Sequence, residues 1–598
     1  MEQQRSHDEH HHIPHEVRMR YWLDFARGKH RREMDLLLRE AKLAGKPHNV
    51  DGRWEGWNNV IKHQAGEAAA MRMLGGALQL PEEQIEQQET FAFVHDARKH
   101  LEKARYRDFI PDERHILKKK LRKIHKEVDP NHRLRTATNE EFFFQVFERT
   151  PGKNLDEKIA NTPKSELLQY YIDSIFDDGT ITPALDLIAK REKRRRDLND
   201  DPRRTKRLGM KYWSAERLLA PKVQTRIWQW LKEKGIDLPS SNALPGFIRE
   251  KIEQDMVAHW LDIHGKQNVS VHLEEGSDFE VETLSDSRRR NASGVLAPEK
   301  NEDTGIIRQR GDIVMAGIFD GATNIGAPLP ISPGKAASVT CREAVAGAQV
   351  DATPREILLQ ANGLLRGIAA GLPLTPEERS EVLCAVGAVA RLDRKAKKLD
   401  VASVADCHIV VLHNDGTNTW LTQNTSEHCE RLEIAAAVWG AQHPRDSLPE
   451  DGELLENLER VMRVSPEERP ALKNPLEDPR VLEVIARNRR LENDLDHGGQ
   501  PSLKGGEDAA LAEGIQERSV RLEDGDEIFL FTDGGYPGPL HTPQQQQEVI
   551  DVLRRGGIQG LRAWVYQKEG ADPLLRDPPR IKQYDDLVVM RMKFESEK

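Results

Sequence analysis

Apolar residues follow two different patterns along this chain, and the pattern changes near residue 265. Between residues 16 and 265, apolar side chains recur three and four positions apart within stretches rich in Leu, Glu, Lys, Gln and Arg. That spacing places them on one face of a helix. It predicts helices at 34–44, 82–105, 112–128, 164–176 and 222–234.

After residue 265, short apolar runs alternate with helical stretches. The runs predict strands at 269–273, 279–283, 313–319, 386–392, 401–404, 408–412, 528–532 and 587–592. Helices are predicted between them at 336–346, 354–369, 376–384, 432–439, 543–555 and 558–567. Strands in runs, with helices in pairs, favour an α+β fold over a doubly wound parallel sheet.

These patterns divide the chain into three parts. Residues 1–15 hold five histidines and few apolar residues, so we expect a disordered tail and not a metal site. Residues 16–265 form the helical region, and residues 266–598 form the α+β domain. Acidic, proline-rich sequence near 444–513 interrupts that domain, and we interpret it as an insertion.

The composition is that of a polar protein that is too long for one ordinary core. The chain has 598 residues and a mean hydropathy of −0.68. No apolar run reaches the roughly 18 residues of a membrane span, and the first residues lack the apolar segment of a secretory signal. The four cysteines are too widely spaced for a disulfide framework. We therefore expect a cytoplasmic protein with no membrane partner.

Charge is distributed unevenly between the two regions. Residues 1–270 carry 50 Lys and Arg against 43 Asp and Glu, a balance of +7, whereas residues 271–598 carry 39 against 56, a balance of −17. The densest basic run is 190–196. Because no nucleic-acid-binding motif accompanies it, we interpret this run as a solvated helix end, and nucleic acid is not favoured. An acidic partner for the basic N-terminal region stays open, as does the oligomeric state.

Acidic residues stand at the ends of several predicted strands in the C-terminal domain. Glu302 and Asp303 precede one strand, and Asp320 follows it. Asp533 follows a very apolar strand, and Asp585 precedes the last strand. Carboxylates at the tips of different strands can converge on one place. Where no His or Cys joins them, they prefer hard cations such as Mg²⁺ or Mn²⁺.

Asp320 and Asp533 are each followed by glycine, but an Asp-Gly pair alone is a weak sign of a site. Asp-Gly is also the commonest dipeptide of tight turns. The chain has further Asp-Gly pairs that we interpret as turns, at 51–52, 178–179, 415–416, 451–452 and 524–525. Position at a strand end and order along the chain distinguish Asp320 and Asp533.

The acidic positions belong to a series of motifs within residues 269–598. In chain order these are Asn301-Glu-Asp303, Ile318-Phe-Asp-Gly321, 399–412 around Asp406, Leu421-Thr-Gln-Asn-Thr425, 524–534 with its Thr-Asp-Gly end, and Tyr584-Asp-Asp-Leu-Val-Val589. The succession resembles that of the PPM (type-2C, metal-dependent) protein serine/threonine phosphatases. The last two motifs together are its specific part, and the third is weak alone. The N-terminal region shows no such resemblance.

The resemblance implies a fold, a reaction and a cofactor. The implied fold is a β-sandwich of two antiparallel sheets flanked by helix pairs. The implied reaction is hydrolysis of phosphoserine or phosphothreonine in a phosphoprotein substrate, by a water that bridges two Mg²⁺ or Mn²⁺ ions. Glu302 resembles a residue that acts on a metal through water, with Asp303 beside it. The resemblance places seven residues in the metal site: Glu302, Asp303, Asp320, Gly321, Asp406, Asp533 and Asp585.

Further roles carry over position by position. Asp320 resembles the carboxylate that bridges both ions, with the Gly321 carbonyl on one of them. Asp533 and Asp585 resemble ligands of the other ion, so the implied catalytic residues are Asp320, Asp533 and Asp585. Asp406 resembles the aspartate of a third, weaker metal position.

Two substrate-handling residues of the family are replaced in this sequence. Ala322 stands where many members have a histidine that can protonate the leaving oxygen. Pro298 stands where the family has an arginine that grips phosphate. Candidate replacements for that arginine are Arg308, Lys300 and the cluster 288–290, and the sequence leaves the choice open.

Some motif residues of the family are present in this sequence and others are replaced, so three interpretations of the C-terminal domain are open. The family's Gly-Asp-Ser turn is here Ala405-Asp406-Cys407, while the main metal carboxylates are present. The first interpretation is an active metal-dependent phosphatase. The second is a PPM-fold pseudophosphatase that binds or senses without hydrolysis. The third is an unrelated α+β protein in which Asp-Gly turns imitate the family's motifs.

Overall fold

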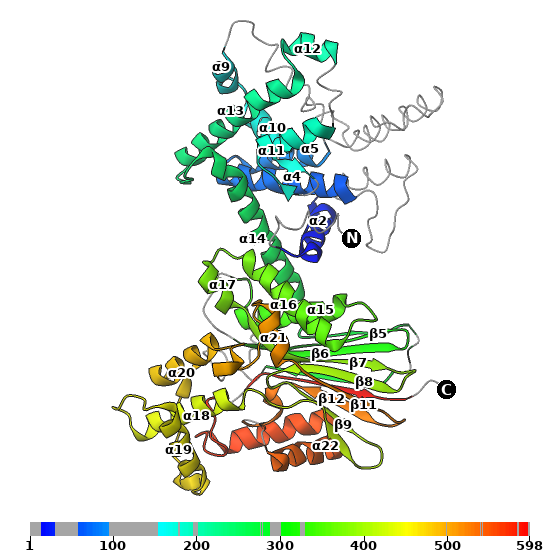
Figure 1. Ribbon diagram of the computed structural model, residues 1–598, viewed down its shortest axis with the longest axis vertical. Helices are drawn as coiled ribbons and strands as arrows, with labels where there is room; N and C mark the ends of the chain where they lie inside the picture. The colour runs from blue at the N-terminus through cyan, green and yellow to red at the C-terminus, as the bar shows by residue number, and fades with distance from the viewer. Residues whose placement is uncertain are drawn as a thin grey trace. The chain divides into compact units, whose positions relative to one another are not determined.

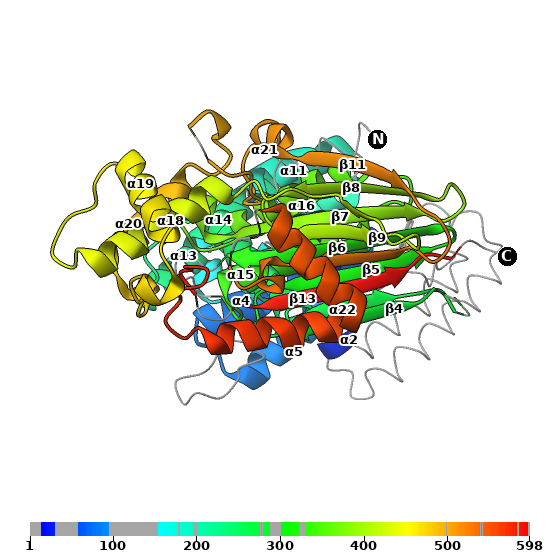
Figure 2. The same cartoon turned by 90° about the horizontal axis from the view of Figure 1, so that it is seen from below.

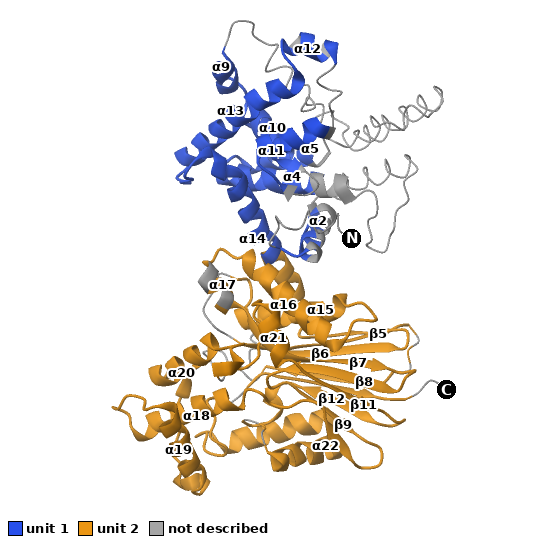
Figure 3. Cartoon of the chain, in the orientation of Figure 1, with its two compact units in different colours: residues 1–257 blue, residues 258–598 orange. Residues whose placement is uncertain are grey.

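The computed structural model of the chain contains two compact units. Unit 1 spans residues 1–257 and unit 2 spans residues 258–598 (Figure 3). The structure describes residues 13–29, 58–94, 154–177, 180–194, 201–275, 277, 279–287, 301–322, 329–497, 499–538, 540, 542–582 and 585–595. Most of the predicted tail, and the predicted helices at 34–44 and 112–128, lie outside these residues.

The described part of unit 1 is helical, as the apolar spacing predicted, apart from the short pair β1 (Phe176–Asp177) and β2 (Thr180–Ile181). Its α10 buries Leu168, Tyr171 and Ile175 completely, which accounts for the helical spacing of those residues. Among the helices that the structure describes, none combines the length and the apolar character needed to cross a bilayer. The helices are α2 (His15–Lys29), α4 (Asn58–Ala77), α5 (Glu82–Val94), α9 (Leu155–Ala160), α10 (Lys164–Ile175), α11 (Ala184–Arg194), α12 (Pro202–Leu208) and α13 (Tyr212–Glu233). The next helix, α14 (Leu244–His264), begins in unit 1 and ends in unit 2.

Unit 2 is built on two packed β-sheets with helices on their outer faces, so the predicted fold class is confirmed (Figure 1). The six-stranded sheet has the order β11 (Gln516–Arg521), β8 (Lys398–Val404), β7 (Cys384–Asp393), β6 (Ile313–Ala322), β5 (Thr304–Arg310), β3 (Val269–His272). The five-stranded sheet has the order β10 (Asn418–Trp420), β9 (His408–Leu412), β12 (Glu527–Phe531), β13 (Leu587–Lys593), β4 (Val281–Asp286).

One detail of the predicted sandwich is wrong, because β3 pairs with β5 in the parallel direction. The chain enters β3 from α14 and continues into β4, which belongs to the other sheet. No hairpin therefore fixes the direction of β3, and it joins its sheet only as an edge strand. The remaining neighbours in both sheets are antiparallel.

The central strands β6, β7, β9, β12 and β13 are buried on both faces because helices or the other sheet cover each face. In β12, Ile528 and Leu530 point into the core between the sheets, whereas Phe529 and Phe531 pack in the cluster that includes residues of α22 (Pro543–Ala571). This explains why an uninterrupted apolar run marks the strand in the sequence. Figures 1 and 2 show which helices cover the outer faces. They are α15 (Pro333–Gly347) and α16 (Pro354–Ala370) on the six-stranded sheet, and α22 (Pro543–Ala571) on the five-stranded sheet.

The predicted insertion contains helices with a core of their own. Leu432, Leu458 and Val481 belong to this core, which lies apart from the core between the sheets. The helices of this core follow β10 and precede β11 in the chain. The first of them, α18 (Glu427–Gln442), lies before residue 444, where the predicted insertion begins. The other helices of this core are α19 (Asp451–Met462) and α20 (Pro479–Arg490). The helix α21 (Asp508–Gly514) also precedes β11 but lies beside α16, and α17 (Pro376–Val382) precedes β7.

Candidate metal centre

Strand direction brings five aspartates to one end of the sandwich. Asp303 directly precedes β5, and Asp320 lies near the end of its antiparallel neighbour β6. Asp406 lies in the turn between β8 and β9. Asp533 follows the end of β12, and Asp585 lies just before β13, which is antiparallel to β12. Five segments that are distant in sequence therefore meet where their strands begin or end.

The aspartates are close enough to shift one another's ionisation. Burial is the largest cause that raises the pKa of Asp303, Asp320, Asp406 and Asp533 well above the usual value for aspartate. Like charge raises these values further. Asp303 acts on the pKa of Asp320, Asp585 and Asp320 act on that of Asp533, and Asp533 acts on that of Asp406. Without a counter-charge, several carboxylates so placed cannot all be ionised cheaply.

The donor set fits a hard divalent cation. One carboxylate oxygen of Asp406 and one of Asp533, in each case Oδ1, is buried and accepts no hydrogen bond. A buried carboxylate oxygen without a partner costs free energy that a cation can offset. Within the described residues, no three Asp, Glu, His or Cys side chains are yet arranged as a preformed ligand set. By the chemistry of their oxygen donors, the residues suit Mg²⁺ or Mn²⁺.

Thr532 fixes the orientation of Asp303. Its hydroxyl donates to Asp303 Oδ2 at 2.6 Å and accepts from the backbone N–H of Val588 at 3.0 Å. Thr532 is fully buried at the end of β12, and its own N–H donates to the Val588 carbonyl at 3.1 Å. One hydroxyl thus joins the tips of β12, β13 and β5.

Asp586 was not assigned a role from the sequence, although it belongs to the last motif. Its Oδ2 accepts from the backbone N–H of Glu302 at 2.9 Å, and its Oδ1 accepts from Ser287 Oγ at 3.3 Å. The Glu302 carbonyl in turn accepts a hydrogen bond from the hydroxyl of Ser338. Glu302 is 1% exposed, so these contacts hold the segment before β5 from two sides.

Two lysines also lie at this end of the sandwich, and the sequence motifs gave no sign of either. Lys582 Nζ lies 2.9 and 3.1 Å from the two carboxylate oxygens of Asp585. Lys335, in the first turn of α15, is buried and donates to the Asp303 carbonyl at 3.4 Å. The pKa of Lys335 is lowered to about 7, chiefly by burial and also by the charge of Arg342, while the charge of Asp303 opposes this shift.

The backbone around the aspartates is tightly packed. A Cβ on Gly321 would lie 2.1 Å from the carbonyl oxygen of Gly334, so only glycine lets β6 approach α15 this closely. In the β8–β9 turn, Ala405 has a φ of 61°, which is strained for a residue with a side chain. A glycine at that position would remove the strain.

None of the basic residues that could replace the missing phosphate-binding arginine is a described residue near the five aspartates. Arg308, one of the candidates left open, donates from Nη1 to the carbonyls of Val345, Ala346 and Ala348 at the end of α15. Lys300 and residues 288–290 lie outside the described residues. The last carbonyls of a helix lack backbone donors, and an arginine can donate hydrogen bonds to them, which accounts for the position of Arg308.

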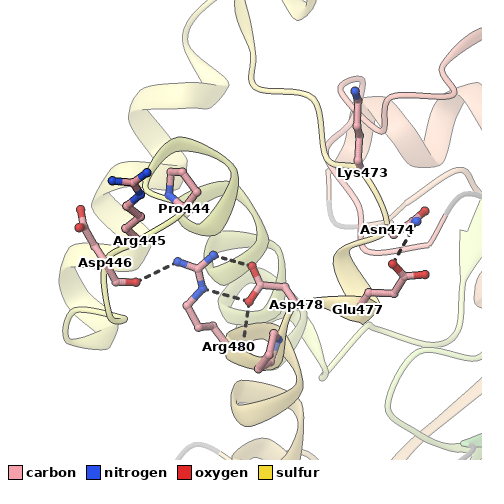
Figure 4. Close-up of a pocket in the computed structure, with 9 residues that line it drawn as sticks. Pro444, Arg445, Asp446, Lys473, Asn474, Glu477, Asp478 and Arg480 are labelled. Carbon is pink, nitrogen blue, oxygen red and sulfur yellow. Dashed lines mark hydrogen bonds and ion pairs between the residues drawn. The ribbon is translucent and has the colours of Figure 1, made fainter.

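A surface cavity elsewhere in unit 2 contains none of these residues. It is lined by residues from the insertion, including Arg445, Lys473 and Arg480 (Figure 4). Arg480 is fully engaged there: it pairs with Asp478 at 2.7 Å and donates to the carbonyls of Gly440, His443 and Asp446. The cavity is therefore a polar surface pocket around an arginine whose contacts are structural.

Comparison with known proteins gives likenesses of fold only. No family model and no curated protein matches this sequence. The Mycobacterium tuberculosis serine/threonine phosphatase PstP/Ppp is similar over 53% of this chain and 99% of its own, with 16% identity and a TM-score of 0.29. RsbX in complex with magnesium is similar over 54% of this chain and 98% of its own, with 11% identity and a TM-score of 0.27. The SiaA-PP2C domain of Pseudomonas aeruginosa is similar over 58% and 95%, with 13% identity and a TM-score of 0.28.

Proposed function

We propose that unit 2 is a phosphatase that depends on Mg²⁺ or Mn²⁺ and hydrolyses phosphoserine and phosphothreonine in proteins. The observation that carries this proposal is the meeting of five aspartates from five strand ends. The raised pKa values of Asp303, Asp320, Asp406 and Asp533, and the unpartnered oxygens of Asp406 and Asp533, favour a strongly charged cation as the natural occupant. The order of the motifs along the chain, which resembles that of the PPM phosphatases, supports the same function.

The residues of this chain divide the work of holding the cations and the substrate. Asp320, Asp533 and Asp585 would hold two cations, with Asp406 as a weaker third position. Bound there, the cations supply positive charge for the phosphate oxygens and a nucleophilic water at neutral pH. Thr532 keeps the Asp303 carboxylate aimed at the same place, and its hydroxyl cannot turn away because it also accepts from the backbone.

The test is turnover of p-nitrophenyl phosphate by the full chain with and without Mn²⁺. We expect Asp320→Asn and Asp533→Asn each to fall below about a tenth of the wild-type rate, while circular dichroism stays unchanged. Asp400→Asn is the matched control, since Asp400 pairs with Lys398 at 2.7 Å and contacts none of the five aspartates. Rates above that level in both variants would contradict the assignment.

A second candidate function is binding without hydrolysis, as in a pseudophosphatase. Two observations favour it: Ala322 lies at the end of β6 where a proton-donating histidine was expected, and Arg308 is engaged elsewhere. This candidate predicts Mn²⁺ binding that is lost in Asp533→Asn, with no turnover of either a nitrophenyl or a peptide phosphate. The experiment above therefore distinguishes the two functions once Mn²⁺ binding is measured beside it.

A further inference from the structure

Lys582 occupies an unusual position for a lysine near a cation site. Its ammonium contacts both carboxylate oxygens of Asp585, at 2.9 and 3.1 Å, in the manner of a bound cation. The side chain is 39% exposed and that of Asp585 is 20% exposed, so the pair lies at the rim of the site. A surface pair of this kind is weak enough to open.

The charge of Lys582 reaches beyond Asp585. It lowers the pKa of Asp320 and of Asp533, opposing the effects of burial and of the neighbouring carboxylates. It also lowers the pKa of Glu433, a carboxyl on α18 whose pKa is raised to about 7, chiefly by burial. One ammonium therefore counters charge on acidic groups from four different segments.

The backbone next to Lys582 is anchored by its neighbour Arg580. Arg580 is 5% exposed, pairs with Asp572 at 2.8 Å, and donates to the carbonyls of Asp572 and Pro578. Lys582 lies two residues further on, so its Cα is held near the site. The half-exposed side chain can then turn toward solvent without unfolding the segment.

We propose that Lys582 is a built-in counter-cation that Mg²⁺ or Mn²⁺ must displace from Asp585. In the cation-free protein its ammonium neutralises part of the acidic cluster. When a divalent ion binds Asp585, the ammonium moves away, and its loss from the carboxylate subtracts from the ion's affinity. The lysine thus sets how much Mg²⁺ or Mn²⁺ the protein needs. This inference rests on the proposed function, since it takes Asp585 as a cation ligand.

The experiment is titration calorimetry of Mn²⁺ into the full chain. Lys582→Gln removes the competing charge, and we expect its dissociation constant for Mn²⁺ to be about threefold to fivefold lower than that of the wild type, a modest factor because the pair is partly exposed. Lys582→Arg keeps the charge and should bind Mn²⁺ like the wild type. The control is Lys398→Gln, which breaks a pair of 2.7 Å with side chains 52% and 25% exposed and should leave the constant unchanged.

A second readout separates competition from a merely structural role. We expect cation-free Lys582→Gln to melt at a lower temperature than the wild type, and to gain more in melting temperature when Mn²⁺ is added. If Lys582 only supported the fold, Lys582→Gln would lower the melting temperature of the cation-free protein without increasing the gain in melting temperature that Mn²⁺ gives.

The outcomes separate this inference from the proposed function. Mn²⁺ binding to Lys582→Gln with equal or weaker affinity than to the wild type overturns the role of Lys582 and leaves the metal site standing. No Mn²⁺ binding to either protein overturns both.

Discussion

The hydroxyl of Thr532 gives the sharpest prediction about how the site is held together. Thr532→Val keeps the shape and volume of the side chain but removes the hydroxyl. Asp303 then loses a donor at 2.6 Å, and the Val588 N–H loses an acceptor at 3.0 Å. Both groups stay buried, because Asp303 is 1% exposed and Val588 is fully buried.

The expected loss of stability follows from those two contacts. A hydrogen bond to a carboxylate contributes about 1.5–3 kcal/mol, and leaving a buried N–H unsatisfied costs about 1–3 kcal/mol. Because the two terms share one hydroxyl, we expect Thr532→Val to lower the free energy of unfolding of unit 2 by about 3 kcal/mol. Thr532→Ser keeps the hydroxyl and loses one methyl group, which costs about 1 kcal/mol.

The assay is urea unfolding of the full chain, with the transition of unit 2 identified by the stabilisation that Mn²⁺ gives it. A double-mutant cycle with Asp303→Asn should show a coupling of at least about 1 kcal/mol between the two side chains. If Thr532→Val and Thr532→Ser were equally stable, the hydroxyl would have no such role.

Three further predictions follow from the same end of the sandwich. In EDTA, the melting temperature of unit 2 should fall as pH rises above the usual range of aspartate pKa values. The raised pKa values of Asp303, Asp320 and Asp533 mean that folding favours the protonated carboxyls, so this stability is present at low pH and lost as pH rises through those values; a melting temperature that rises with pH above that range would contradict the sign. Ala405→Gly should stabilise unit 2 by about 1 kcal/mol, because it relieves a φ of 61°, whereas Ala402→Gly within β8 should destabilise it; equal losses in urea unfolding would refute this. Ala322→His should raise turnover of a phosphoserine peptide relative to p-nitrophenyl phosphate, since the alkoxide leaving group needs a proton and nitrophenolate does not; an unchanged ratio with Mn²⁺ binding intact would count against the role of this position.

Apolar patterning was enough to locate the strands that are buried on both faces. The predicted strand at 408–412 coincides with β9, and the two predicted helices at 543–567 are the two parts of α22, which bends at Gly557. The Asp-Gly pairs at 415–416 and 524–525 are turns as predicted, with Gly416 and Gly525 at positive φ, whereas the turn predicted at 451–452 is wrong because that pair begins α19. The correctly predicted features are local, so the sequence alone determines them.

Features that depend on distant contacts were missed. The strand β5 holds buried polar residues such as Arg308, and β11 is an exposed edge strand, so neither gives a clear apolar pattern. The roles of Asp586, Lys335 and Lys582 come from contacts between segments far apart in the sequence. The predicted set Glu302, Asp303, Asp320, Gly321, Asp406, Asp533 and Asp585 stays a prediction as a set of metal ligands.

The most direct test of the central claim is anomalous diffraction from crystals of the full chain soaked in Mn²⁺. The account predicts anomalous peaks within coordination distance of Asp320, Asp533 and Asp585, and their absence from crystals of Asp533→Asn soaked in the same way. Peaks that lie only at other places, or that persist unchanged in Asp533→Asn, would contradict it.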